Sequence, residues 1–118
     1  MVKEQIHNYT GHIIRILNRE DDRIIKTFSK SGRVTRVSHR TEQKGFLLGV
    51  IPLGTTYVKN FYSEPPAYQE GVYYIVSHCF KAYFPNRLDI LTCQEQVKNP
   101  DGSVKGCYIL SNEIVRED

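Results

Sequence analysis

The side chains best suited to chemistry lie within residues 71–89 (GVYYIVSHCFKAYFPNRLD), where Ser77 and His78 are followed by Arg87 and Asp89. The apolar run before Ser77 predicts a buried strand, and Ser77 is a typical N-cap, so a short helix is expected to begin there. A helix N-terminus presents free N–H groups and a positive dipole end, which together favour anions. Ser77, His78, Arg87 and Asp89 are therefore candidate ligand-binding residues. Two roles stay open for Arg87, since it can hold a phosphate or pair with Asp89 and lock the turn.

Ser77, His78 and Asp89 are also the residue types of a hydrolase triad, and Cys79 beside His78 has the types of a thiol enzyme. A triad is defined by geometry, and adjacent Ser and His side chains at a helix start point in different directions. The sequence also lacks a Gly-x-Ser-x-Gly elbow. We therefore expect a protein with no catalytic residues that is not an enzyme, and a small nucleotide hydrolase is the weaker alternative.

Metal and cofactor motifs are missing from the sequence. The four histidines show neither His-x-x-x-His nor His-Glu-x-x-His spacing, and the glycines form no Walker or Rossmann pattern. The three cysteines form no Cys-x-x-Cys pair, which argues against a disulfide framework and for a reducing compartment. We expect no metal ion, no cofactor and, because no apolar run is long enough, no membrane span.

The charge distribution favours phosphate. Residues 1–44 contain ten Lys or Arg and five Asp or Glu, so the first part of the chain is basic. Arg36 and Arg40 are the candidate phosphate ligands, because a guanidinium binds phosphate through two hydrogen bonds. Tyr62 and Tyr68 flank a proline loop and are candidates to stack on a base, although tyrosines more often fill the core of a small β-rich domain. No motif specific for nucleic acid is present.

The elements that must position these residues are short. Strands are expected over residues 12–17, 23–28, 33–40, 46–50, 57–62, 72–76, 88–93 and 104–110, with a helix over 78–84. Residues 41–44 are expected to form a loop, and Pro52 and Gly54 a turn. This pattern predicts an α+β fold, a mainly antiparallel curved sheet or partial barrel with one short helix near residues 78–84. Residues 1–118 are expected to form a single domain whose ends, 1–11 and 113–118, are flexible.

The C-terminal half resembles a group of small phage, prophage and bacterial proteins of largely unassigned function. That group has the pattern Gly-x-Tyr-Tyr-Ile-Val-Ser, Pro-x-Arg-x-Asp and Val-x-x-x-x-Gly-x-x-x-Gly-Cys. The matching residues here are Gly71, Tyr73, Tyr74, Ile75, Val76, Ser77, Pro85, Arg87, Asp89, Val97, Gly102, Gly106 and Cys107. The chain departs from the group at residues 63–66 (SEPP), where an acidic-glycine-proline loop is common.

The resemblance implies a phage protein that acts in the cytoplasm of a bacterial host cell. The leading hypothesis is a non-enzymatic homo-oligomer that sequesters a small phosphorylated signalling nucleotide of host immunity. This step is an analogy with phage anti-defence proteins. The alternative is a protein–protein inhibitor or structural phage component that docks on an acidic host surface.

Overall fold

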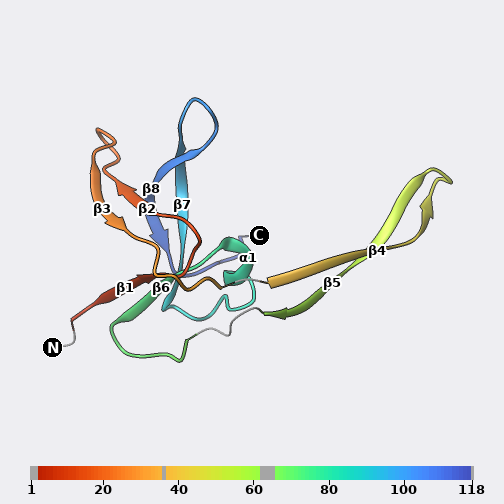
Figure 1. Ribbon diagram of the computed structural model, residues 1–118, viewed down its shortest axis with the longest axis horizontal. Helices are drawn as coiled ribbons and strands as arrows, with labels where there is room; N and C mark the ends of the chain where they lie inside the picture. The colour runs from red at the N-terminus through yellow and green to blue at the C-terminus, as the bar shows by residue number, and fades with distance from the viewer. Residues whose placement is uncertain (1–2, 36, 62–65, 118) are drawn as a thin grey trace.

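The computed structural model describes residues 3–35, 37–61 and 66–117. The elements in chain order are β1 (Gln5–Asn8), β2 (Ile14–Leu17), β3 (Ile24–Phe28), β4 (Val37–Leu47), β5 (Ile51–Phe61), β6 (Val72–Ile75), α1 (His78–Lys81), β7 (Ile90–Lys98) and β8 (Val104–Ser111). Six strands form a curved sheet in the order β1-β6-β7-β8-β2-β3, while β4 and β5 form a separate two-stranded ribbon (Figure 1). We call the six-stranded sheet with α1 the body, and β4, β5 and their turn the arm. The predicted α+β class, a curved sheet with one short helix, is confirmed.

The body combines both kinds of strand pairing. The hairpins β2–β3 and β7–β8 are antiparallel, whereas β6 pairs in parallel with β1 on one side and β7 on the other. The central strand β6 buries Tyr74 and Ile75, which is consistent with its unbroken apolar run. The residues that the sequence placed in a flexible lead-in therefore include a strand, β1, because main-chain pairing with β6 holds it in the sheet.

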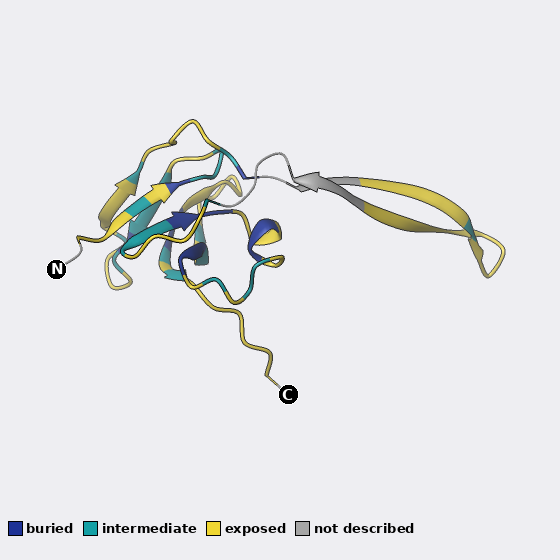
Figure 2. Cartoon of the chain, turned by 90° about the horizontal axis from the view of Figure 1, so that it is seen from below, coloured by how far each residue is buried: buried dark blue, intermediate teal, exposed yellow. Residues whose placement is uncertain are grey.

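The core lies between β6, β7 and α1. Its buried cluster contains Tyr74, Val76, Phe80 and Ile90, and in Figure 2 the part of the arm whose burial is described contains no buried residue. The helix begins after Ser77 as expected but ends at Lys81, and residues up to Phe84 continue as turns. This short helix serves mainly to place Phe80 over the sheet.

The arm is where the sequence-based assignment is wrong. Residues 41–44 belong to β4, residues 51–54 belong to β5, and the turn lies at residues 48–50, inside the predicted buried strand 46–50. The apolar run predicts burial, but the arm residues there are exposed. Pro52 is tolerated opposite Phe46 because each strand of a two-stranded ribbon has an outer edge that needs no N–H donor.

Gly106 allows β8 to approach β2 closely. A Cβ at Gly106 would lie 2.7 Å from the carbonyl oxygen of Arg15 and 2.9 Å from Cγ of Leu17. Since β2 and β8 pair in parallel at Ile16 and Cys107, this contact joins the β2–β3 hairpin to the rest of the sheet.

We expect Gly106→Ala to lower the free energy of unfolding by about 1–3 kcal/mol, the usual cost of overpacking, because the backbone of β2 must move away. Urea denaturation followed by circular dichroism measures the change. Gly45→Ala is the matched control, since a Cβ at Gly45 meets no atom within 4 Å. Equal midpoints for the two variants would contradict the close approach.

Candidate functional site

Ser77 and His78 are both engaged within the body. The Ser77 hydroxyl oxygen accepts a hydrogen bond from the Phe80 backbone N–H at 3.3 Å, so it caps α1. His78 Nε2 lies 2.8 Å from the carbonyl oxygen of Cys93 and ties α1 to β7. The helix start predicted as an anion site is thus built from side chains that already have structural partners.

Arg87 pairs with Asp89 and locks the turn, which is one of the two roles that the sequence left open for Arg87. Arg87 Nε donates to Asp89 Oδ1 at 3.0 Å, and Nη2 donates to Asp89 Oδ2 at 2.5 Å. Nη2 also donates to the Pro66 carbonyl oxygen at 2.8 Å, which holds the loop before β6. Because the Asp89 side chain is 3% exposed, this is a bidentate ion pair whose carboxylate is removed from water. Asp89 is therefore oriented by Arg87 and is not aligned with His78 as in a triad.

Lys81 is a buried charged residue that the sequence analysis did not single out. It is fully buried, and its Nζ donates to the carbonyl oxygens of Phe84, Arg87 and Asn112 at 3.2, 2.7 and 2.9 Å. Burial lowers the pKa of the Lys81 ammonium, while the nearby Asp89 carboxylate opposes that shift. Three carbonyl acceptors match the three N–H donors of an ammonium, so Lys81 clamps the turns after α1 to the segment after β8. Nothing in the local sequence distinguishes it from a surface lysine.

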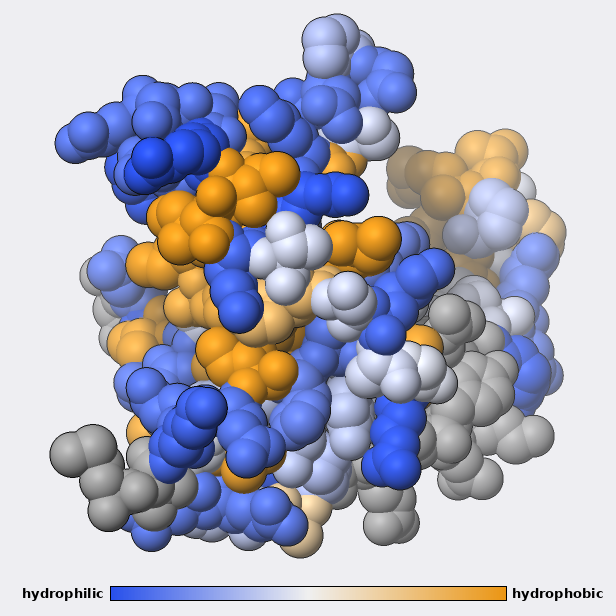
Figure 3. Space-filling view, turned by 60° about the vertical axis from the view of Figure 1, so that its left-hand side comes forward, coloured by the Kyte–Doolittle hydropathy of each residue, from blue (hydrophilic) through white to orange (hydrophobic). Residues whose placement is uncertain are grey.

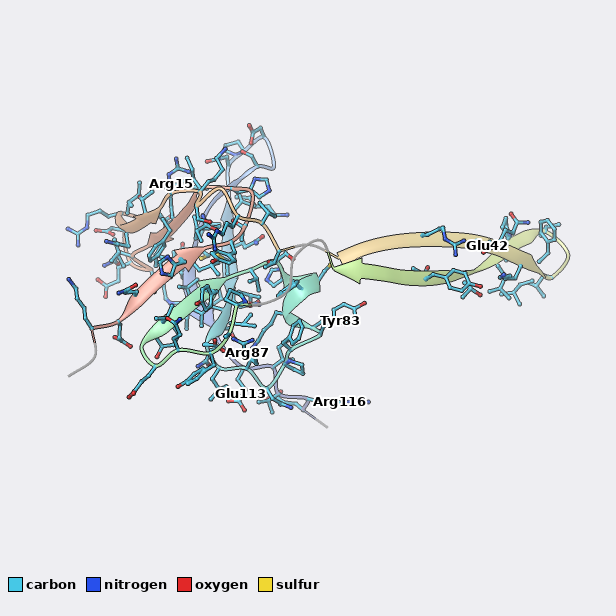
Figure 4. The ribbon with its side chains drawn as sticks, turned by 60° about the horizontal axis from the view of Figure 1, so that its bottom comes forward. Arg15, Glu42, Tyr83, Arg87, Glu113 and Arg116 are labelled. Carbon is cyan, nitrogen blue, oxygen red and sulfur yellow. The ribbon has the colours of Figure 1, made fainter. Side chains whose placement is uncertain are left out.

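The remaining predicted ligands are not brought together with Ser77. Arg40 lies on the arm, pairs with Glu42 at 2.8 Å and sits 4.6 Å above the Tyr57 ring. Figure 4 shows Glu42 on the arm and Arg87 in the body. Tyr68 is 68% exposed in the loop before β6. Arg36 and Tyr62 lie outside the described residues.

A cavity opens on the body between β2, β7 and β8, with a volume of about 380 Å³. Its wall includes Ile13, Ile14 and Val104, and the basic residues Arg15 and Lys105 also line it. The other lining residues are His12, Cys93, Gln96, Ser103, Gly106 and Cys107. Burial and a hydrogen bond with Cys107 raise the pKa of the Cys93 thiol to about 12, so this thiol stays protonated and is a poor nucleophile.

The arm carries the largest group of exposed apolar side chains in the part of the chain that is described. We call residues 45–54 (GFLLGVIPLG) the tip; they include no charged residue. The side chains of the tip are exposed as follows: Phe46 59%, Leu47 50%, Leu48 89%, Val50 76%, Ile51 49% and Leu53 47%. Exposed apolar groups of this size are typical of interaction surfaces.

No relative of this chain is found among known proteins. The chain matches no protein-family model, no curated protein and no solved structure. Across residues 3–35, 37–61 and 66–117, no helix has the length and apolar character needed to cross a membrane. Over the same residues, no three His, Cys, Asp or Glu side chains gather in a way that could hold a metal ion.

We expect Asp89→Asn to lower the free energy of unfolding by about 3 kcal/mol, because it leaves the Arg87 guanidinium beside a neutral amide in a largely buried place. Urea denaturation measures the loss. Glu95→Gln is the control, since Glu95 pairs with Arg19 and both side chains are half exposed, so its midpoint should barely move. Equal midpoints for Asp89→Asn and the wild type would show that the pair is not structural.

Proposed function

We propose that this protein is a non-enzymatic docking component that engages another protein through the apolar tip of its arm. The observation that carries the proposal is the tip itself, six large apolar side chains exposed at the far end of a projecting ribbon. In Figure 1 the arm leaves the body and extends away from the sheet. When the arm has no partner, its apolar tip is exposed to water, and this exposure costs free energy. A partner that covers the tip removes that cost.

The conformation of Leu48 supports this proposal. Leu48 has φ of 52° and Gly49 has φ of 74°, and the Val50 N–H closes the turn on the Leu47 carbonyl oxygen at 3.1 Å. Two consecutive positive φ angles are typical of a tight hairpin turn in which Asn or Asp precedes Gly. A leucine there is strained and is also the most exposed apolar side chain of the chain as described. Strain of this kind points to a residue kept for binding rather than for folding.

The charges of the arm contribute less than its apolar tip. Arg40 and Lys44 both pair with Glu42, at 2.8 and 3.3 Å, and both lie over the Tyr57 ring. Because Arg40 and Lys44 share the single Glu42 carboxylate, this group keeps one net positive charge beside six exposed apolar side chains. Docking by apolar contact fits better than docking by charge.

The resemblance to small phage and prophage proteins supports the same class of function. A structural component or an inhibitor needs a firm platform and a projecting contact element. The body provides the platform, through the Arg87–Asp89 pair and the Lys81 clamp. The arm provides the contact element. We propose a phage origin on this basis.

The substitution Leu48→Asn separates docking from folding. Asn before Gly suits the turn, so the variant should be as stable as the wild type or more stable. It removes the most exposed apolar side chain, so the protein purified from cells should lose its partner, with affinity at least tenfold weaker. Native mass spectrometry reports the partner, and thermal unfolding reports the fold.

Val115→Asn is the matched control, because Val115 is also an exposed apolar residue, 69% exposed, but lies in the C-terminal segment. It should keep the partner. The proposal is overturned if the wild type carries no second protein chain, or if Leu48→Asn retains its partner as well as Val115→Asn does.

A second candidate function is sequestration of a phosphorylated nucleotide, now at the β2–β8 cavity. The specific observation in its favour is that His12, Arg15 and Lys105 line a cavity of about 380 Å³ beside the aliphatic side chains of Ile13, Ile14 and Val104. Apolar walls with a few cationic groups suit a base joined to phosphate. The residues differ from those predicted from the sequence.

Calorimetry with a panel of cyclic and ADP-ribose nucleotides tests this candidate. Binding heat is expected for at least one ligand, and Arg15→Gln should weaken it at least tenfold because a phosphate contact is lost. Arg116→Gln is the control, since Arg116 lies in the C-terminal segment away from Arg15 (Figure 4). The absence of binding heat with every nucleotide of the panel would exclude this function.

A further inference from the structure

The six-stranded sheet of the body has two free edges that curve toward each other. The order β1-β6-β7-β8-β2-β3 leaves β1 at one end and β3 at the other, and within the described residues no ladder joins them. Asn8 connects the two ends. Its Nδ2 donates to the carbonyl oxygen of Phe28 at 3.2 Å, and its own carbonyl oxygen accepts from the Ser31 N–H at 3.3 Å. The sheet is therefore closed at Asn8 by a side chain and a loop.

Beyond Asn8 the two edges enclose a cleft with a volume of about 560 Å³. The strand β1 lines it with Glu4, Ile6, His7 and Asn8 at its side, and β3 and the loop after it line it with Lys26, Thr27, Phe28, Ser29 and Ser31. Along β3 the side chains of Ile24 and Ile25 are 50% and 60% exposed. Figure 3 views the body from the side of β1 and β3, where apolar side chains reach the surface among polar ones.

The main-chain groups of Ile6 point into this cleft. Gln5 donates its N–H to the Gly71 carbonyl oxygen at 2.8 Å, on the side of β6. Tyr9 donates to the Ile75 carbonyl oxygen, also at 2.8 Å. Main-chain groups alternate in direction along a strand, so the N–H and C=O of Ile6 face away from β6 and toward the open edge.

The main-chain groups of Thr27 point into the cleft from β3. Thr27 lies opposite Arg15 in the β2–β3 pair. The Arg15 carbonyl oxygen faces β8, because a Cβ at Gly106 would lie 2.7 Å from it. In an antiparallel pair, two opposite residues either exchange both of their hydrogen bonds or turn both sets of groups away from each other. Thr27 therefore turns its N–H and C=O to the outer edge of β3.

An extended polypeptide strand matches these two edges. Its N–H and C=O groups point alternately to either side, so one strand can bond to both Ile6 and Thr27. The spacings of a sheet give each strand residue about 160 Å³, so a cleft of about 560 Å³ has room for about three residues. The pairings also make β1 and β3 run in the same direction around the sheet. A strand antiparallel to one edge is thus antiparallel to both, which is the more stable pairing.

The charges beside the cleft favour an acidic occupant. Residues 23–33, which contain β3 and the loop after it, include four basic residues and no acidic one: Arg23, Lys26, Lys30 and Arg33. All four are exposed, and none of them forms a salt bridge across residues 3–35, 37–61 and 66–117. On the other side of the cleft Lys3 and Glu4 balance each other. Carboxylates complement such a surface.

We propose that the cleft between β1 and β3 binds an extended acidic segment of a partner protein as an added strand. The segment lies antiparallel to both edges and pairs with the main-chain groups of Ile6 and Thr27. Its carboxylates face the basic residues of β3 and the following loop. Main-chain hydrogen bonds supply affinity and the charges supply selectivity, as in other cases of strand addition. This surface is separate from the arm tip, so the inference goes beyond docking through the tip.

Nuclear magnetic resonance titration of the isotope-labelled full chain tests the proposal with three synthetic peptides. The first is acetyl-Glu-Val-Glu-Val-Glu-amide, which should bind and shift the amide signals of Ile6 and Thr27. The second is the same peptide with methylated valine nitrogens, which removes the N–H donors on one side of the strand. The third has lysine in place of glutamate. The second and third peptides should each bind at least tenfold more weakly than the first.

Thr27→Pro tests the edge from the side of the protein. It removes an N–H that faces the cleft and not β2, and proline is tolerated at such a position, so the fold should be kept. The first peptide should bind at least tenfold more weakly to it. Thr27→Ser is the matched control, since it keeps the N–H and should bind as the wild type does. Ile6→Pro makes the same test on β1, and thermal unfolding reports the fold of each variant.

The proposal is overturned if the first peptide does not bind or shifts only amides outside the cleft. Equal binding of the methylated peptide would mean attraction by charge without strand pairing, and equal binding of the lysine peptide would mean that the partner is not acidic. Either result overturns the proposal. Ile6 and Thr27 amides that are slow to exchange before any peptide is added would show that a segment of this chain fills the cleft, which also overturns it.

Discussion

The rest of the body depends on the buried Lys81 ammonium and its three carbonyl partners. Together with the Arg87–Asp89 pair, Lys81 fixes the turns after α1, the start of β7 and the segment after β8. Phe80 is thereby held over Tyr74 and Ile90 in the core. Buried charges are stable only when every donor is satisfied, so these groups are committed to structure. The polar side chains whose types suggest chemistry in the sequence are the ones whose hydrogen bonds hold the fold together.

The arm has the opposite character. It makes a long antiparallel ladder within itself, and its apolar residues are left in water at the tip. Folding alone gives no reason to keep Leu48 in a left-handed turn at 89% exposure. A body whose buried ionic groups are paired, joined to an arm whose apolar tip is exposed to water, is the arrangement expected of a protein that works by association.

Much of the body was predictable, because its signals are local. The Ser77 cap, the buried run at β6, the β2–β3 hairpin and the turn before β8 each follow from residue type and spacing. The arm was not predictable, because the run from Phe46 to Val50 has the hydropathy of a core strand and nothing in the sequence says that it lies outside. The role of Lys81 was hidden for a similar reason, since its three partners are backbone carbonyls that only the fold brings together. For Arg87 the sequence offered two roles, and the structure shows its ion pair with Asp89.

The most direct test of this account is amide hydrogen exchange of the tip, residues 45–54, in the wild-type protein at increasing dilution. If the tip is enclosed by another chain, its outer-edge amides are slow to exchange in the assembly and become fast as dilution separates the chains. The body amides of β6 stay slow throughout, because their hydrogen bonds lie within one chain. Tip amides that exchange fast at every concentration would contradict the claim that the arm is a docking element covered by protein.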